Sequence, residues 1–164
     1  MIKPRISLWA AVAILSLVLN GGLIYLLLIA GKTEQNVTAA DPRTTVILDE
    51  GERALVLAEM RAFLSAVQAM NSALAAGDLA EVEKSARSVG QAAAQGVPVS
   101  LMTKLPMQFK QLGLSTHQGF DQIAMDARDI ADAKHSLQQV GQLLNNCVAC
   151  HATYQLQAVP AKPQ

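Results

Sequence analysis

The chain has 164 residues, which is enough for one domain and one additional element. Hydrophobic residues make up 51% of the sequence, aromatic residues only 4%, and the formal net charge is zero. A sequence rich in Ala, Leu, Val and Gln with so few aromatic residues is typical of a small helical domain and not of an all-β domain. The balanced charge gives no indication of a nucleic-acid partner, because domains that bind nucleic acid usually carry a basic surface.

The N-terminal segment, residues 6–30, contains no charged side chain. A helix over this range would be about 37 Å long, enough to cross a hydrocarbon core of roughly 30 Å with some tilt. Lys3 and Arg5 precede it, so we expect the N-terminus to stay in the cytoplasm and the rest to be exported. A cleaved signal peptide is the alternative, although its apolar region is usually only about 7–15 residues long. Residues 1–30 are therefore interpreted as a single-pass anchor (or an uncleaved signal) in the cytoplasmic membrane, with the C-terminal domain in the periplasm.

Residues 31–48 are interpreted as a polar linker in which Asp41-Pro42 breaks regular structure. No strand-like alternation of useful length is expected in the chain. The first domain helix is predicted over about 49–76, and Gly77-Asp78 is expected to end it and to cap the next helix. Its apolar residues recur at alternating spacings of four and three, as in a bundled helix: Val56, Met60, Phe63, Val67, Met70 and Leu74.

Three further helices are predicted at about 79–95, 106–133 and 135–156, with a loop between Gly96 and Leu105. Gly113 and Gly119 weaken the third helix as an unbroken element. The predicted inward face of the last helix consists of Leu137, Val140, Leu144, Cys147, His151 and Tyr154. Four amphipathic helices joined by short loops predict an all-α fold, an antiparallel up-down four-helix bundle over residues 49–156 that follows one N-terminal transmembrane helix. Residues 157–164 would form a C-terminal tail.

The two cysteines of the chain stand in Cys147-Val148-Ala149-Cys150-His151. Two thiols at this spacing can form thioether bonds to one haem, and the imidazole that follows is then placed to bind the iron, which is the signature of c-type haem. A zinc site would need further paired ligands, and a redox dithiol normally follows a strand. The predicted register places Cys147 and His151 on the inward face, with Cys150 close beside them. The sequence therefore predicts one covalent haem c, with its iron bound by His151.

A helical bundle with this motif near the end of its last helix resembles the cytochrome c′ and cytochrome c-556 family, the class II c-type cytochromes. The resemblance covers about residues 49–156. Tyr154, three residues after the histidine, also fits that family's motif, whereas Gln155 stands where members usually carry a basic residue. In this family the residue opposite the histidine comes from the first helix, and it is a Met in the electron-transfer members and a non-ligating apolar residue in the gas-binding ones.

Met60 is the expected distal iron ligand, because it lies on the inward face of the first helix and its distance from Gly77 in the sequence is close to the family's spacing. His117 is the alternative distal ligand; otherwise we expect it at a solvent-exposed or boundary position. His135 is expected to be solvated at the opposite end of the bundle. Arg53 and Arg61 are candidates for contacts with the haem propionates.

The expected function is electron transfer by a membrane-anchored, periplasmic mono-haem cytochrome whose partners are redox proteins at the membrane surface. No enzymatic activity is expected, because the sequence shows no catalytic triad, no phosphate-binding loop and no carboxylate pair near the haem motif. The alternative is a protein of the cytochrome c′ type that binds nitric oxide or carbon monoxide at an open distal iron site. The resemblance also makes a homodimer an open possibility.

Overall fold

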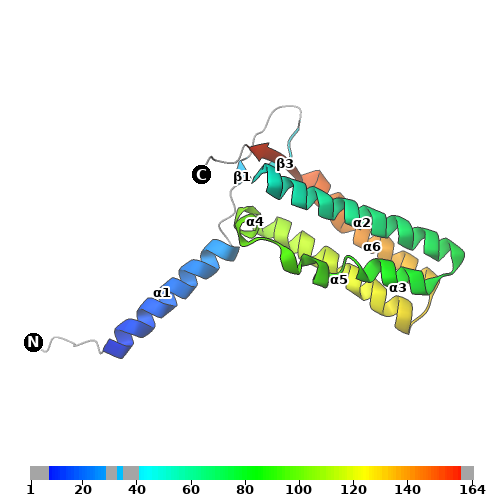
Figure 1. The fold of residues 1–164 in the computed structure, drawn as a ribbon, viewed down its shortest axis with the longest axis horizontal. Helices are drawn as coiled ribbons and strands as arrows, with labels where there is room; N and C mark the ends of the chain where they lie inside the picture. The colour runs from blue at the N-terminus through cyan, green and yellow to red at the C-terminus, as the bar shows by residue number, and fades with distance from the viewer. Residues whose placement is uncertain (1–7, 29–32, 35–40, 160–164) are drawn as a thin grey trace, which may run out of the picture.

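A computed structural model describes residues 8–28, 33–34 and 41–159. These residues are mostly helical, which confirms the all-α prediction at the level of secondary-structure content (Figure 1). The elements follow one another along the chain as α1 (Leu8–Leu28), β1 (Thr33–Glu34), β2 (Thr44–Asp49), α2 (Glu50–Ala76), α3 (Leu79–Arg87), the 3-10 helix η1 (Gln91–Gly96), α4 (Val99–Lys104), α5 (Met107–Asp129), α6 (Ala133–Thr153) and β3 (Tyr154–Val159).

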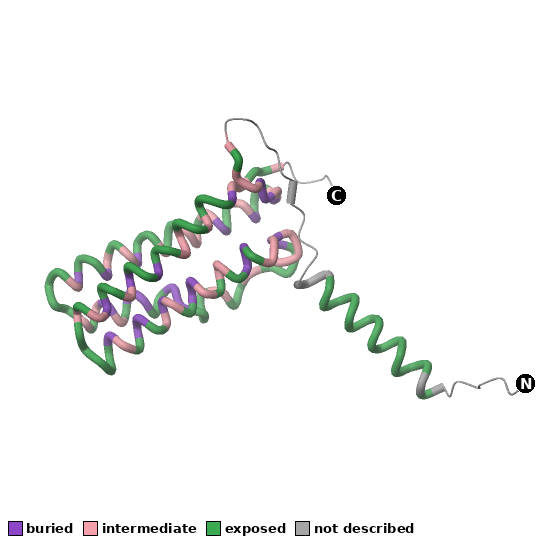
Figure 2. Tube along the Cα trace, turned by 180° about the vertical axis from the view of Figure 1, so that it is seen from behind, coloured by how far each residue is buried: buried purple, intermediate pink, exposed green. Residues whose placement is uncertain are grey.

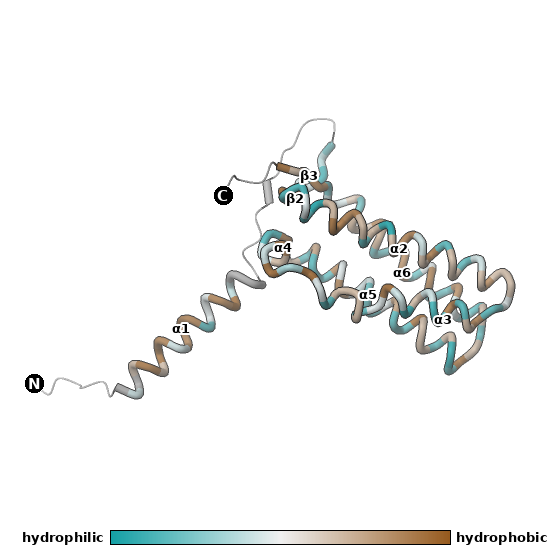
Figure 3. The backbone as a smooth tube through the Cα atoms, in the orientation of Figure 1, coloured by the Kyte–Doolittle hydropathy of each residue, from teal (hydrophilic) through white to brown (hydrophobic). Residues whose placement is uncertain are grey.

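Helix α1 projects away from the other helices (Figure 1), and apolar residues recur along its length (Figure 3). The side chains described in it, residues 9 and 11–25, are exposed (Figure 2). The predicted span is longer than this helix, and residues 6–7 and 29–30 lie outside the described residues. Within the described part of the chain, no helix is both long enough and apolar enough to cross a membrane.

Helices α2, α3, α5 and α6 pack lengthwise: α2 contacts α3 and α6, and α5 contacts α3 and α6 (Figure 1). Local signals set their ends. Asp49 and Glu52 form a capping box at the start of α2, and Gly77, with φ of 71°, ends that helix in the left-handed conformation. The Asp78 side chain accepts a hydrogen bond from the Glu81 backbone and begins α3. The predicted boundary at Gly77-Asp78 therefore agrees with the structure.

Two apolar clusters fill the helical domain. The turn-side cluster lies toward the α2–α3 turn and consists of Ala66, Met70, Ala73, Val82, Ala86, Val89, Phe120, Ile123, Ala124, Ala127, Val140 and Leu143. The strand-side cluster lies toward the strands and consists of Val46, Leu48, Val56, Leu101, Leu105, Phe109 and Tyr154. Each cluster draws side chains from at least four elements, so the domain has two packed regions along its length.

Strands β2 and β3 pair in parallel, from Thr44 opposite Tyr154 to Asp49 opposite Val159, and β1 pairs antiparallel with the other edge of β2. The linker prediction was therefore wrong for residues 44–48, and the prediction of helix was wrong for 154–156. Residues 157–159 of the predicted tail belong to β3, and residues 160–164 lie outside the described part. Residues 44–47 are all β-branched, which favours a strand, but the partner strand lies far along the chain and leaves no local sign.

The helix boundaries between residues 87 and 133 also differ from the prediction. Helix α3 ends at Arg87 and not near 95, and α4 occupies part of the predicted loop. The backbone amide of Gln91 donates to the carboxylate of Asp121 on α5. This bond turns the chain toward α5, so the helix does not continue past Gly90. Helix α5 ends at Asp129, with Ala131 in the left-handed conformation, while Gly113 and Gly119 lie inside an unbroken helix.

Candidate functional site

The C-terminal half of α6 carries the predicted haem motif. The buried and half-buried residues on the inward face of α6 have the expected spacing but are rotated relative to the prediction. They are Ser136, Val140, Leu143, Cys147 and Cys150, and Tyr154 continues the series as the first residue of β3. Leu137 is 53% exposed and Leu144 is 37% exposed, so both predicted seam positions were wrong. Leu143 and Leu144 are adjacent, so hydrophobicity alone could not decide which of them faces inward. Ser136 is polar, so nothing in the sequence indicated that it would lie in the interior.

The two cysteines and the histidine of the motif therefore differ in their surroundings. Cys147 and Cys150 are both half-buried, whereas the side chain of His151 is exposed. The expectation that His151 lies on the inward face was wrong, because position 151 follows Cys150 by about 100° around the helix and so turns outward. The two thiols, three residues apart, are thus better shielded from solvent than the imidazole that follows them.

Both cysteines are free thiols. Burial raises the pKa of the Cys147 thiol, and burial together with the neighbouring Cys147 raises the pKa of the Cys150 thiol. Reactive cysteines of redox enzymes have the opposite property, a lowered pKa that supplies thiolate at neutral pH. Thiolate is therefore scarce in this pair at neutral pH, which makes the pair poorly suited to rapid thiol–disulfide exchange.

Met60 and Cys150 meet at one apolar region. Met60 on α2 is half-buried and packs against the strand-side cluster, and Cys150 on α6 packs against the same cluster. Strands β2 and β3 pair in parallel at the end of the domain where α6 ends and α2 begins. The structure thus brings two of the predicted site residues, far apart in the sequence, to a shared surface.

Arg43 was missed by sequence reasoning. Its Nη1 donates to the backbone carbonyl of His151 at 3.4 Å, while its Nη2 lies 2.6 Å from the carboxylate of Asp41. The hydrogen bond from Arg43 lowers the pKa of Asp41 to about 2. Arg43 therefore ties the last turn of α6 to the segment before β2. Because its partner is 108 residues away, no local pattern pointed to it.

His117 is buried, only 4% exposed, so the expectation of a solvent-exposed or boundary histidine was wrong. Its Nδ1 donates to the Val89 carbonyl at 2.8 Å, its Nε2 lies 3.2 Å from Oε1 of Glu59, and its ring packs edge-on against Phe63. The hydrogen bond with Glu59 raises the pKa of His117 against the opposing effect of burial. Both ring nitrogens have partners in the protein, so iron could bind here only after one of these bonds was broken.

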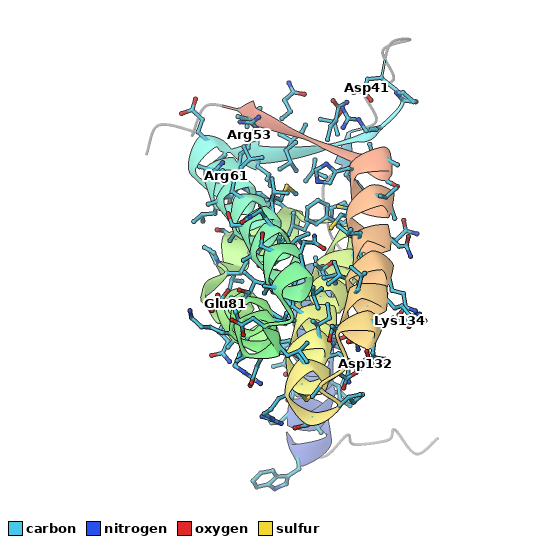
Figure 4. The ribbon with its side chains drawn as sticks, turned by 90° about the vertical axis from the view of Figure 1, so that its right-hand side faces the viewer. Asp41, Arg53, Arg61, Glu81, Asp132 and Lys134 are labelled. Atoms are coloured by element: carbon cyan, nitrogen blue, oxygen red, sulfur yellow. The ribbon has the colours of Figure 1, made fainter. Side chains whose placement is uncertain are left out.

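The other basic residues considered from the sequence lie apart from the thiols or at the surface. Arg53 and Arg61 lie on α2, toward the end that β3 crosses (Figure 4). Arg53 Nε donates to the Leu156 carbonyl at 3.4 Å, and Arg61 is exposed. His135 lies at the opposite end of α6, half-buried and not simply solvated, with its Nε2 3.0 Å from Oδ2 of Asp126.

A cavity of about 420 Å³ lies between α2, η1, α4 and α5. It borders the strand-side cluster and shares Val56, Leu105 and Phe109 with it, but Cys147, Cys150 and Met60 do not line it. In the part of the chain that the structure describes, no three His, Cys, Asp or Glu side chains are grouped to hold a metal ion. The donor set fits a haem in its chemistry: two half-buried thiols, an imidazole on the next residue, and the Met60 thioether at the cluster that Cys150 also contacts.

Comparison of the chain with family models, with curated proteins and with solved structures found no match.

Proposed function

We propose that this protein is a mono-haem c-type cytochrome that transfers electrons. Cys147 and Cys150 would hold the haem through thioether bonds, and His151 would bind its iron from one side. The observation that carries the proposal is the motif Cys-Val-Ala-Cys-His at the end of α6, with both thiols half-buried and Cys150 packed against the strand-side cluster. The raised pKa of each thiol argues against a role in rapid disulfide exchange.

We infer that α2, α3, α5 and α6 form an antiparallel up-down four-helix bundle, as in the class II c-type cytochromes. The ring of contacts from α2 to α3, α5, α6 and back to α2 supports this arrangement. Such a bundle places residues of facing helices around one interior, where cofactors of helical bundles are bound.

A bound haem supplies one-electron chemistry at its iron, and the protein sets its potential through the axial ligands and the polarity of the surroundings. The strand-side cluster would exclude water from one side of the group, because its seven members are buried. Met60 is the proposed distal ligand, since its side chain reaches this cluster from α2. Arg43 would hold the last turn of α6, and with it the backbone of His151, in place.

The location of the protein is part of the proposal. We propose that residues 6–30 anchor the chain in the cytoplasmic membrane and that the helical domain lies in the periplasm, where redox partner proteins at the membrane surface would exchange electrons with it. The uncharged sequence of this segment and the helix α1 within it support an anchor. The full chain should resist extraction from membranes by alkaline carbonate, and a variant that lacks residues 6–30 should not. Release of the full chain into the supernatant would contradict the anchor.

Covalent haem is tested by producing the full chain in bacteria that attach c-type haem to exported proteins. We expect one haem per chain by the pyridine haemochrome spectrum, and haem that stays with the protein in a denaturing gel. The double variant Cys147→Ser/Cys150→Ser should abolish the covalent link, whereas Val148→Ala, a change at an exposed position between them, should keep it. A wild-type chain that acquires no haem under these conditions would refute the proposal.

The distal ligand separates electron transfer from gas binding. With Met60 bound, the oxidised protein should show a low-spin spectrum with a sulfur-to-iron charge-transfer band in the red, and Met60→Leu should become high-spin and bind carbon monoxide. Met70→Leu is the control, because Met70 is fully buried in the turn-side cluster. A wild-type protein that is already high-spin and binds carbon monoxide would establish the gas-binding alternative. A low-spin spectrum unchanged in Met60→Leu would exclude Met60 and make His117 the candidate.

A further inference from the structure

The interhelical cavity described above is a feature that the haem motif does not explain. Its volume of about 420 Å³ falls within the range of small-molecule sites, roughly 300–1,000 Å³. Most of its lining is apolar, contributed by four elements that include Leu101 on α4 and Phe109 on α5. Three side chains with polar ends also line it: Glu59, Lys110 and His117. This combination, an apolar wall with few polar groups, is the usual composition of a ligand pocket.

Gly113 is an independent indication that this space is kept open. It lies inside α5, where glycine is unfavourable compared with alanine. Elsewhere in the domain, close contacts account for buried or half-buried glycines: a Cβ at Gly90 would meet Asp121 and one at Gly119 would meet Leu143. Gly113 lines the cavity, and a Cβ added there would point into open space, with nothing within 4 Å. No packing contact in the protein therefore requires glycine at position 113.

The polar groups of the cavity indicate the charge of a ligand. Glu59 and His117 are bonded to each other, so each already has a partner within the protein. Lys110 is only 6% exposed, and burial lowers its pKa, so an anion placed beside it would favour its charged form. Lys110 has a partner within the protein, but an ammonium has three N–H donors and can bond to an additional acceptor.

The position of the cavity relative to α1 indicates where an apolar ligand would come from. Helix α1 contacts α4, and α4 contributes Leu101 and Met102 to the cavity wall. The helix proposed to enter the bilayer thus meets the domain at the element that forms this wall. A molecule with a hydrocarbon chain that is held in the membrane would thus lie near this wall of the cavity.

We propose that this cavity binds a medium-chain fatty carboxylate, with the carboxylate beside Lys110 and the hydrocarbon chain along Leu101, Leu105 and Gly113. The site is separate from the haem motif, since neither cysteine of the motif nor Met60 lines it. The proposal does not depend on haem attachment and adds a ligand class to an electron-transfer protein.

The test uses the full chain in lipid nanodiscs and decanoate labelled with ¹³C at its carboxyl carbon. A protein-dependent shift of the carboxyl resonance, saturable on titration, is expected, and empty nanodiscs should not produce it. Gly113→Leu should weaken this binding at least tenfold without lowering the thermal unfolding midpoint, because its side chain would fill the cavity. Lys110→Met should weaken it to a similar extent, whereas Lys134→Met, at an exposed position on α6, should not. Labelled oleate placed in the nanodisc lipid beforehand distinguishes supply from the bilayer from supply by solution.

Three results would overturn the proposal. The first is the absence of a saturable shift with both decanoate and oleate. The second is binding of the uncharged analogue decanol as strong as that of decanoate, which would exclude recognition of an anion. The third is loss of covalent haem in Gly113→Leu, measured by the haemochrome spectrum, which would assign the cavity to the haem. A wild-type chain that binds decanoate but acquires no haem would refute the proposed function alone, so the two failures are distinguishable.

Discussion

At the scale of single residues, Gly90 and Gly113 differ in whether their surroundings require glycine. A Cβ at Gly90 would lie 1.9 Å from Oδ1 of Asp121, whose other carboxylate oxygen accepts a hydrogen bond from the Gln91 backbone at 3.0 Å. The carboxylate would have to move, and this bond between α5 and the start of η1 would be lost. At Gly113 an added Cβ has open space. Glycine is thus sterically required at position 90 and not at 113.

We therefore predict that Gly90→Ala lowers the free energy of unfolding by about 1–2 kcal/mol, the combined cost of the lost hydrogen bond and of local strain from the steric overlap. Gly113→Ala should raise the free energy of unfolding by about 0.5–1 kcal/mol, because alanine favours a helix interior. Urea denaturation monitored by circular dichroism measures both values. Equal effects of the two substitutions would show that the contact with Asp121 does not constrain Gly90.

His117 should make stability depend on pH. The hydrogen bond with Glu59 raises its pKa in the folded protein above the ordinary 6.5, so the folded protein holds this proton more tightly than the unfolded chain. The stabilisation is therefore complete below about pH 6.5 and is lost as the pH rises through the higher folded pKa. We expect the unfolding midpoint to fall between about pH 6 and pH 9, and His117→Gln to reduce this fall. A midpoint that is independent of pH in the wild type would contradict the prediction.

At the scale of elements, the pairing of β2 with β3 is the contact that closes the domain at one end. Leu48 of β2 is fully buried in the strand-side cluster, together with Val46 and Tyr154. Removing most of its side chain leaves a cavity where three elements meet. The strands should therefore contribute to stability through their buried side chains as well as through their hydrogen bonds.

We predict that Leu48→Ala lowers the free energy of unfolding by about 2–5 kcal/mol, the range for truncation of a buried leucine. Leu64→Ala on α2 is the matched control, because Leu64 is 70% exposed, and its effect should stay within about 0.5 kcal/mol. Guanidinium denaturation measures both. Similar effects of the two changes would mean that the β2–β3 end is not a cooperative part of the fold.

The elements that were predicted well have local causes. The boundary between α2 and α3 follows from Gly77 and Asp78, two residues that set the end of one helix and the cap of the next by themselves. Strand β3 was missed because Tyr154 and its neighbours pair with residues near position 45, far away in the sequence. The phase of α6 was wrong because hydrophobicity alone could not choose between Leu143 and Leu144, and only packing against α5 and α2 decides it.

In the candidate site, too, features with local causes could be predicted and features that depend on distant contacts could not. Cys147, Cys150 and His151 could be found from the sequence because the motif is contiguous and its chemistry depends on spacing. The burial of His117 and the bond from Arg43 to the His151 carbonyl depend on residues brought together by the fold. Such contacts leave no periodic signal, and only the structure reveals them.

At the scale of the whole molecule, the two apolar clusters divide the domain into halves that should respond differently to haem. The strand-side cluster contacts both Cys150 and Met60, whereas neither residue contacts the turn-side cluster. A covalently attached haem would therefore add buried contacts mainly to the strand-side half. Local stability in a protein follows such differences in buried contact, and amide hydrogen exchange reports it.

We predict that haem attachment slows amide exchange at least tenfold in β2, the first half of α2, α4 and the end of α6. Amides of α3 and of the middle of α5 should change less. The comparison is between the haem-loaded protein and the Cys147→Ser/Cys150→Ser double variant, by exchange and mass spectrometry. A uniform slowing along the whole domain would show that the two clusters unfold as one unit.

The parallel pairing of β2 with β3 also has a consequence for the order of events as the chain is made. Gln155 on β3 bonds to Thr45 on β2, 110 residues earlier, so this end of the domain closes only when nearly the entire chain is available. Contacts so distant in sequence form late, because the closure entropy of the long loop must be overcome first. Cys147 and Cys150 directly precede β3 in the sequence. Until β3 pairs with β2, the motif would therefore lie in a domain whose end is still open, and the pairing of the two strands would close it.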